Sequence, residues 1–367
     1  MSELLRVEGL VKHFPLDRHR YVAAVNDVSF VIGRGETLGL VGESGSGKTT
    51  VGRCILRLIE PTAGRVWFDG RDITSLPDEQ LRPLRHRLQL VFQEPFASLN
   101  PRRNVRQTVE EPLLLQGGMS ARQRSDRLRE TLALVHLGDR HLGRYPNQLT
   151  ASEQQRVGIA RAIVTHPDLV VLDEPTSSLD QTVRAEILDV LVDLQDRLGT
   201  AYLFISHDLT AVESVSHRIA IMYLGRIVES GSTQQIFGRQ YHPYSRALLS
   251  AVLYPDPRRK LEPFTLRGEI PSAINPRDEC ALYGRCPIGL PSCTESAPPL
   301  EEVEAGHFAA CFRWREFVSG KATAVTPPVE GAPHPAVSRW AGRDPARRPG
   351  DKAADPEWCS PVTKQER

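Results

Sequence analysis

Long apolar runs are missing from this sequence. No stretch approaches the ~20 consecutive apolar residues that are needed to cross a bilayer. The opening residues, MSELLRVEGL, also lack the apolar core of a signal peptide. We therefore expect a chain that stays in the cytoplasm and reaches a membrane only through partner proteins.

A strong excess of charge of one sign is missing as well. Lys and Arg number 46 against 45 Asp and Glu, which gives a formal net charge of +1. Proteins that bind nucleic acid usually present a basic surface to its phosphates. The charge balance therefore argues against a nucleic-acid partner.

Cysteine is scarce, with six in 367 residues. That number is too small for a disulfide scaffold in a chain of this length. Four of the six nevertheless gather between residues 280 and 311, and this cluster needs its own explanation. No internal repeat is present, so we expect one copy of the main domain.

What the sequence does contain is an alternation of strands and helices. The segments LLRVEGLVKHF and VAAVNDVSFVI alternate apolar and polar residues, which predicts antiparallel strands near the N-terminus. Buried strands are predicted at TLGLV, LVVLD and TAYLFIS, each followed by a helix or a helical region. This order is typical of a parallel sheet covered on both faces. We expect a main domain over residues 1–240, a smaller one over 241–318, and a disordered tail over 319–367.

A glycine-rich segment follows the first buried strand and matches the phosphate-loop pattern G-x-x-x-x-G-K-[ST]. Glycines let backbone N–H groups converge on phosphate oxygens, and the following helix N-terminus adds partial positive charge. A chance glycine-rich turn is the alternative, but the strand–loop–helix context disfavours it. We predict that Lys48 reaches the β- and γ-phosphates of ATP and that Thr49 binds Mg²⁺. The predicted ATP-binding residues here are Gly42, Glu43, Ser44, Gly45, Ser46, Gly47, Lys48, Thr49 and Thr50.

An acidic pair ends the second buried strand, in LVVLDEP. Ligands of parallel sheets bind at the carboxyl ends of the strands, so Asp173 is predicted to hold Mg²⁺ through water. Glu174 is predicted to orient or deprotonate the attacking water. Such a pair alone is more often a solvated strand end. Together with the phosphate loop, it favours a catalytic interpretation.

The order of these motifs resembles that of ATP-binding-cassette (ABC) ATPases over roughly residues 5–315. The resemblance implies an α/β fold, with a P-loop NTPase core, an antiparallel β subdomain, a helical subdomain and a small cysteine-containing C-terminal domain. It implies that Gln93, in LVFQEPF, touches Mg²⁺ and relays the nucleotide state to membrane subunits. It also implies that His207, in FISHD, contacts the γ-phosphate.

Two further roles follow from the same resemblance. Asp180, in the run Ser177–Asp180, matches a loop that crosses the interface of a cassette dimer. An aromatic residue upstream of the phosphate loop stacks on adenine in this family. Phe14 is the first choice for that role and Tyr21 the second.

The runs FQEPFASLNPR, YHPYSRALL and RGEIPSAINP resemble the ATPases of dipeptide and oligopeptide importers. This resemblance implies a heterodimer with a second, different ABC ATPase, two transmembrane permease subunits, and indirectly an external solute-binding protein. It places the chain on the cytoplasmic face of the membrane. The alternatives are a soluble ABC ATPase uncoupled from transport and a regulatory nucleotide-binding subunit with weak turnover.

One family motif is altered. The family's signature, Leu-Ser-Gly-Gly-Gln, caps the γ-phosphate bound by the partner cassette. The matching residues here are Leu149, Thr150, Ala151, Ser152 and Glu153. Side chains now stand where backbone must approach closely, and a carboxylate is added near an anion. We expect a site completed by this segment to hydrolyse ATP slowly or only bind it, whereas this chain's own phosphate loop is complete.

The cysteine cluster supplies four thiols with the spacing C-x₅-C-x₆-C-x₁₇-C. Four thiolates can hold a tetrahedral zinc or an iron–sulfur cluster, and a zinc site more often contains a close C-x₂₋₄-C pair. The cysteine pattern resembles that of peptide-importer ATPases, some of which bind a 4Fe-4S cluster there. We expect an iron–sulfur cluster, with zinc or merely buried thiols as alternatives, at Cys280, Cys286, Cys293 and Cys311.

Overall fold

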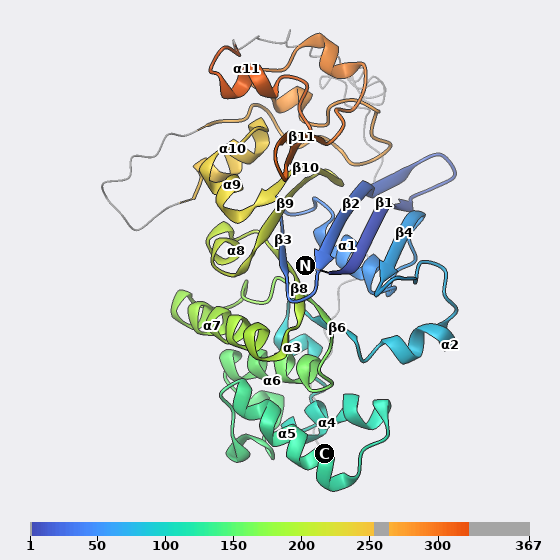
Figure 1. Ribbon diagram of the computed structural model, residues 1–367, viewed down its shortest axis with the longest axis vertical. Helices are drawn as coiled ribbons and strands as arrows, with labels where there is room; N and C mark the ends of the chain where they lie inside the picture. The colour runs from blue at the N-terminus through green and yellow to red at the C-terminus, as the bar shows by residue number, and fades with distance from the viewer. Residues whose placement is uncertain (1, 253–263, 323–367) are drawn as a thin grey trace, which may run out of the picture. The chain divides into compact units, whose positions relative to one another are not determined.

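A computed structural model describes residues 2–252 and 264–322 of the chain (Figure 1). Most of the predicted disordered tail, from residue 323 onward, therefore lies outside the described residues. The described part contains a large sheet in the order β11-β12-β10-β9-β3-β8-β7-β6. Its strands are β3 (Thr37–Val41), β6 (Leu88–Val91), β7 (Leu169–Asp173), β8 (Ala201–Ser206), β9 (Arg218–Tyr223), β10 (Arg226–Ser232), β11 (Glu301–Glu304) and β12 (His307–Ala309).

The centre of the large sheet is parallel, as the sequence predicts. Strand β3 pairs in parallel with β8 and β9, and β7 pairs in parallel with β6 and β8. Successive residues of β7 contribute to two different apolar clusters, Val170 and Leu172 to one and Leu169 and Val171 to the other. Both faces of the sheet are therefore covered, which explains the nearly continuous apolar sequence of its strands.

A second, antiparallel sheet is built from the N-terminal part of the chain, and it confirms the predicted β subdomain. Its order is β2-β1-β4-β5. Figure 1 shows it beside α1, the helix that follows the phosphate loop. These elements are β1 (Glu3–Pro15), β2 (Tyr21–Gly33), β4 (Ala63–Phe68), β5 (Arg71–Asp72) and α1 (Lys48–Ile55).

The predicted helical region lies between β6 and β7 in the sequence and projects away from the sheet in Figure 1. Asn104 and Ser120 cap α4 and α5, each through a reciprocal pair of hydrogen bonds with the third helical residue. The long helices of this region pack their apolar sides against α6. The helices of this region are α3 (Pro95–Ser98), α4 (Val105–Gln116), α5 (Ala121–Leu134) and α6 (Ala151–Ile163), and the short helix α2 (Asp78–Leu81) precedes β6.

The segment after residue 264 supplies two strands of the large sheet, a feature that sequence reasoning did not predict. Strand β12 pairs antiparallel with β10 and β11. The side chains of Glu229 on β10 and His307 on β12 are fully buried, and their Oε1 and Nε2 atoms lie 2.9 Å apart. The remaining helices are α7 (Gln181–Leu198), α8 (Leu209–Val215), α9 (Thr233–Gly238), α10 (Pro243–Ser250) and α11 (Trp314–Val318).

Candidate nucleotide-binding site

The glycine-rich loop joins β3 to α1, in the predicted strand–loop–helix context. Two of its glycines are required by close backbone neighbours. A Cβ on Gly42 would lie 2.1 Å from the carbonyl oxygen of Met222, and one on Gly47 would lie 2.0 Å from that of Ala24. Both also have positive φ angles, of 155° and 101°. The loop can therefore pass this close to β9 and β2 only with glycine at these two positions.

Lys48 is the first residue of α1 and is almost fully buried. Its Nζ donates hydrogen bonds to the carbonyl oxygens of Gly42, at 2.8 Å, and of Glu43, at 2.9 Å. Burial lowers the pKa of Lys48, and the carboxylates of Glu174 and Asp173 oppose that shift. The ammonium group is thus held at the mouth of the loop, where it can meet an anion.

The rest of the loop is divided between buried and accessible residues. Ser44 and Gly45 are exposed at its tip, whereas Ser46 is buried and accepts a hydrogen bond of 3.0 Å from the backbone N–H of Gly225. Thr50 is half-buried in the first turn of α1. The exposed backbone at the tip can approach phosphate oxygens.

Thr49 and Asp173 are brought together although 124 positions separate them. The hydroxyl of Thr49 donates a 2.8 Å hydrogen bond to Oδ1 of Asp173. Asp173 ends β7 and is 5% exposed, and burial raises its pKa while the Thr49 hydrogen bond opposes the rise. Hydroxyl and carboxylate oxygens are the ligands that Mg²⁺ prefers, so this pair fits the predicted metal position.

Two side chains that follow the strands on either side of β7 converge on the carboxylate of Glu174. Glu174, after β7, accepts a 3.1 Å hydrogen bond from Nε2 of Gln93, which follows β6. Its other oxygen lies 3.3 Å from Nδ1 of His207, which follows β8. Glu174 has a positive φ of 48°, and its N–H donates to the carbonyl oxygen of Ile205. The arrangement offers a base, an amide and an imidazole to a water molecule beside the phosphate loop.

The two aromatic candidates lie near each other on the β1–β2 hairpin. Tyr21 stacks on His13, with ring centroids 4.3 Å apart. Phe14 is 36% exposed, and Nζ of Lys12 lies 5.0 Å from the centroid of its ring. Phe14 therefore keeps more free aromatic surface, and adenine stacking stays a prediction for both residues.

The altered signature begins α6 and forms a capping box. The Thr150 hydroxyl accepts a hydrogen bond from the Glu153 N–H, and the Glu153 carboxylate accepts one of 2.9 Å from the Thr150 N–H. The same carboxylate lies 3.2 Å from Nε2 of the buried His141. Hydrogen bonding to the Thr150 backbone lowers the pKa of Glu153. Its charge is therefore turned back onto this helix, while Ala151 is exposed and Ser152 half-buried.

Asp180, the predicted interface residue, is the N-cap of α7. Its carboxylate accepts a 3.0 Å hydrogen bond from the Val183 N–H. In the same run, the Ser177 hydroxyl donates to the carbonyl oxygen of Glu174. The run is thereby connected to the acidic pair.

Contacts from the C-terminal segment to the phosphate loop were missed by sequence reasoning. Tyr244 on α10 and Arg285 both bond to Glu43. The sequence separations are 201 and 242 positions, so no local pattern could have indicated these contacts.

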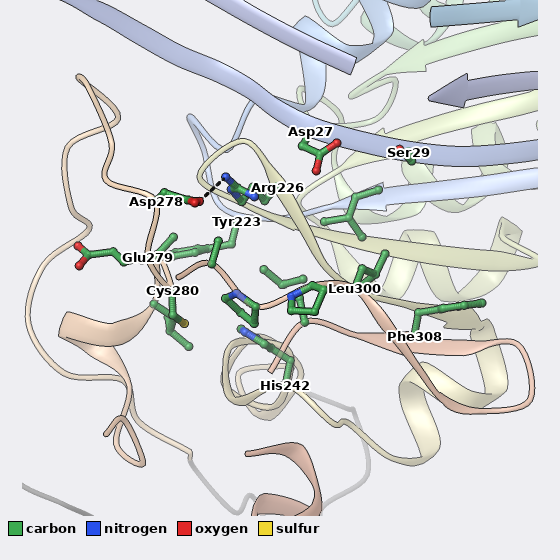
Figure 2. A pocket seen from close by; sticks show the side chains of 18 residues that line it. Asp27, Ser29, Tyr223, Arg226, His242, Asp278, Glu279, Cys280, Leu300 and Phe308 are labelled. Atoms are coloured by element: carbon green, nitrogen blue, oxygen red, sulfur yellow. Dashed lines mark hydrogen bonds and ion pairs between the residues drawn. The ribbon is translucent and has the colours of Figure 1, made fainter. Parts of the chain in front are cut away.

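The four clustered cysteines line one cavity of about 20 Å³. Burial raises the pKa of Cys280 and of Cys311 to about 12. Within residues 2–252 and 264–322, no three His, Cys, Asp or Glu side chains are arranged as ligands of one metal ion. A larger cavity, of about 540 Å³, lies beside Cys280, and Figure 2 shows Arg226, Asp278 and His242 in its lining.

Among the described residues, none of the helices has the length and apolar character of a membrane span. Residues 25–177 match the ABC transporter family model, and residues 228–293 match the model for the oligopeptide/dipeptide transporter C-terminal region. A solved dimer of the ATP-binding cassette MJ0796 bound to ADP and phosphate has 29% sequence identity and a TM-score of 0.58, and covers 63% of this chain and 100% of that one.

Curated relatives match over nearly their whole length. An ATP-binding protein of Brucella ovis is 47% identical, over 85% of this chain and 98% of the relative. The dipeptide transport ATP-binding protein DppF of Haemophilus influenzae is 42% identical, over 85% and 97%. The oligopeptide transport ATP-binding protein AppF of Bacillus subtilis is 41% identical, over 84% and 96%. The chain therefore belongs to the ATP-binding proteins of ABC transporters, in the group with the oligopeptide/dipeptide transporter C-terminal region, and it is an ATPase.

Proposed function

We propose that this ATPase powers the import of peptides or related small solutes across the cytoplasmic membrane. The observation that carries the proposal is the match of residues 228–293 to the oligopeptide/dipeptide transporter C-terminal region. The 41% and 42% identities to relatives named for oligopeptide and dipeptide transport support it. The chain would act from the cytoplasmic face, where ATP is available.

The proposed chemistry is hydrolysis of MgATP at the phosphate loop. Lys48 would hold the β- and γ-phosphates, and Thr49, Asp173 and Gln93 would hold Mg²⁺. The contact between Thr49 and Asp173 and the one between Gln93 and Glu174 support this assignment. Mg²⁺ would neutralise charge on the phosphates. Glu174 would orient or deprotonate water, and His207, 3.3 Å away, would contact the γ-phosphate.

An uptake assay tests the transport proposal. A strain lacking the chromosomal copy is supplied with the wild-type chain or with Lys48→Ala, and uptake of a labelled dipeptide and a labelled oligopeptide is measured. We expect uptake only with the wild-type chain. If the wild-type chain hydrolyses ATP but supports no uptake, the result would favour an ATPase that is uncoupled from transport. Uptake that survives Lys48→Ala would favour a regulatory subunit.

We also propose two permease subunits, an external solute-binding protein and a second, different ATPase as partners. The altered signature supports the second ATPase, because a homodimer would complete both ATP sites with Thr150–Glu153. Loss of one well-placed donor to a reacting oxyanion costs ~10²–10³ in rate. Because the capping box holds the Glu153 carboxylate on its own helix, the argument rests on the lost donors and not on a negative charge beside the partner's phosphate.

Single-glutamate variants of the assembled transporter test this asymmetry. Glu174→Gln should remove nearly all turnover, whereas the equivalent change in the partner should remove little. Equal losses would show that the altered signature still completes an active site. Restoring the signature with Thr150→Ser, Ala151→Gly, Ser152→Gly and Glu153→Gln should raise the rate at the slow site.

For the cysteines we propose a 4Fe-4S cluster, with zinc as the alternative. The support is that four cysteines, of which the first and last are 31 positions apart, line one cavity. The buried thiols must lose their protons to bind a metal, and the cavity must widen, so we expect the segment to rearrange on loading. Bound there, the cluster would supply a structural crosslink.

Metal analysis of protein purified without oxygen tests the cluster. About four iron atoms per chain and a brown colour are expected. Stoichiometric zinc without iron would establish the alternative. Cys286→Ser should lower the melting temperature and assembly before it alters nucleotide binding at the phosphate loop.

A further inference from the structure

The phosphate loop contains a carboxylate, Glu43, whose negative charge opposes the binding of phosphate. Glu43 lies in the loop that is proposed to cradle an anionic triphosphate, and its side chain is 31% exposed. A carboxylate at this position repels phosphate unless a cation neutralises it. The nearby Lys48 ammonium donates to backbone oxygens of Gly42 and Glu43 and to the Ser46 hydroxyl.

The cation that pairs with Glu43 comes from the described residues that contain the four clustered cysteines, 264–322, which we call the cysteine segment. Nη1 of Arg285 lies 3.2 Å from Oε2 of Glu43, and the Arg285 side chain is only 13% exposed. The same nitrogen lies 3.4 Å from the hydroxyl of Tyr223, which ends β9. Tyr223 therefore contacts the same guanidinium nitrogen that pairs with Glu43.

A second contact fixes the backbone of the same loop residue. The Glu43 N–H donates a 2.9 Å hydrogen bond to the hydroxyl of Tyr244, which is 1% exposed. Tyr244 packs against Tyr223, with ring centroids 4.6 Å apart. Both the backbone and the side chain of Glu43 are thus held by residues far beyond the loop.

Arg285 is placed by a short 3₁₀ turn, Tyr283–Arg285, between two of the clustered cysteines. The Tyr283 N–H donates to the carbonyl oxygen of Cys280, and the Cys286 N–H donates to that of Tyr283. The Arg285 carbonyl accepts a 2.9 Å hydrogen bond from the Arg267 N–H. These backbone hydrogen bonds fix the position from which the Arg285 side chain extends.

We propose that Arg285 and Tyr244 are positioning residues for ATP binding, through which the C-terminal segment neutralises and orders the phosphate loop at Glu43. Without them, the loop would present an unpaired negative charge to the nucleotide and would have to be ordered during binding. The effect should fall on ATP affinity more than on kcat, because Glu174, Gln93 and His207 are untouched. The inference rests on the proposed binding of ATP at this loop.

The test is the dissociation constant of a fluorescent ATP analogue, measured on the complete transporter together with kcat and the melting temperature. Arg285→Ala should weaken binding about threefold to tenfold, a range typical of coupled charged neighbours. Arg285→Lys should recover part of the loss, and Tyr244→Phe should weaken binding by less. Arg315→Ala is the matched control, since Arg315 stacks on Trp314 in the same segment.

The decisive variant is Glu43→Gln combined with Arg285→Ala. Removing the unpaired carboxylate should restore most of the affinity that Arg285→Ala loses. A merely structural role for Arg285 predicts no such rescue, so an unrescued or additive double variant would overturn the proposal. Unchanged affinity in Arg285→Ala would overturn it as well. Lys48→Ala is measured in parallel, and normal binding by that variant would instead refute the proposed nucleotide site.

Discussion

The nucleotide site and the cysteine segment, residues 264–322, are built in contrasting ways. At the nucleotide site, Gln93, Glu174 and His207 meet because each follows one of three adjacent parallel strands. The cysteine segment has short strands and single turns, and buried side-chain pairs such as Glu229–His307 attach it to the sheet. The order of strands in the sequence is enough to predict a site at the ends of parallel strands. It is not enough to predict a segment that is held by contacts between distant residues.

The contrast has an energetic side. Removing a residue at the nucleotide site should abolish chemistry without unfolding the chain, because the parallel strands position the loops. Removing a buried partner in the segment should cost stability first, because few regular hydrogen bonds remain there to hold it. The four predictions below test this division.

The largest effect is expected for Glu174→Gln in the assembled transporter. Turnover should fall by about 10²–10⁴-fold, the range for losing a general base, while ATP binding and the melting temperature persist. ATP hydrolysis and bound nucleotide are the measurements. Glu213→Gln, at an exposed position of α8, is the control. Unchanged turnover would remove Glu174 from its proposed role.

The second effect concerns Glu229, which should matter for stability rather than chemistry. Glu229→Ala leaves His307 buried without its carboxylate and also removes the acceptor for the N–H groups of Tyr241 and His242. Breaking a buried pair from one side costs about 3–5 kcal/mol. Denaturant unfolding should show this loss, and Glu301→Ala on exposed β11 should show almost none. A loss below that of the control would mean that β12 is held by other contacts.

The third effect is a pH dependence of stability that arises from His242, the N-cap of α10. Complete burial lowers the pKa of His242 to about 3. Between pH 6.5, where the unfolded histidine titrates, and about pH 3, the unfolded chain binds more protons. The free energy of unfolding should therefore fall with decreasing pH, by up to about 1.4 kcal/mol per unit from this residue.

His242→Asn provides the comparison for that slope. The amide oxygen can accept from the Tyr244 N–H as Nδ1 of His242 does, at 3.2 Å, but does not titrate. Unfolding measured from pH 7 to pH 4 should show a shallower pH dependence in the variant. Identical slopes would assign the acid sensitivity to other groups.

The smallest effect is expected at the cap of α6. Thr150→Ala removes the hydroxyl that accepts from the Glu153 N–H, and such a loss costs about 0.5–2 kcal/mol. Thr150→Ser should retain the cap and the wild-type melting temperature. A Thr150→Ala variant as stable as wild type would show that Glu153 alone satisfies the helix start.

Much of the nucleotide site could be predicted from local sequence. The pattern Gly42–Thr49 specifies a loop whose backbone faces an anion, and the apolar run before Asp173 specifies a buried strand that ends in carboxylates. Because period and loop chemistry are local properties, the parallel core, the antiparallel N-terminal sheet and the helical region were also predictable. The sequence predicted four thiols near one another without specifying what they bind.

Only the tertiary structure decided how the C-terminal segment is attached. The pairing of β12 with β10, the burial of His307 against Glu229 and the contact of Arg285 with Glu43 join positions 78 or more residues apart. The orientation of the Glu153 carboxylate was likewise decided by its surroundings, since His141 contacts one of its oxygens and the Thr150 N–H donates to the other. Local composition determines which elements form, but a long-range contact depends on how the elements pack. The sequence alone therefore determined where the phosphate-binding and catalytic residues lie along the chain. Packing of the elements determined which distant side chains hold those residues in position.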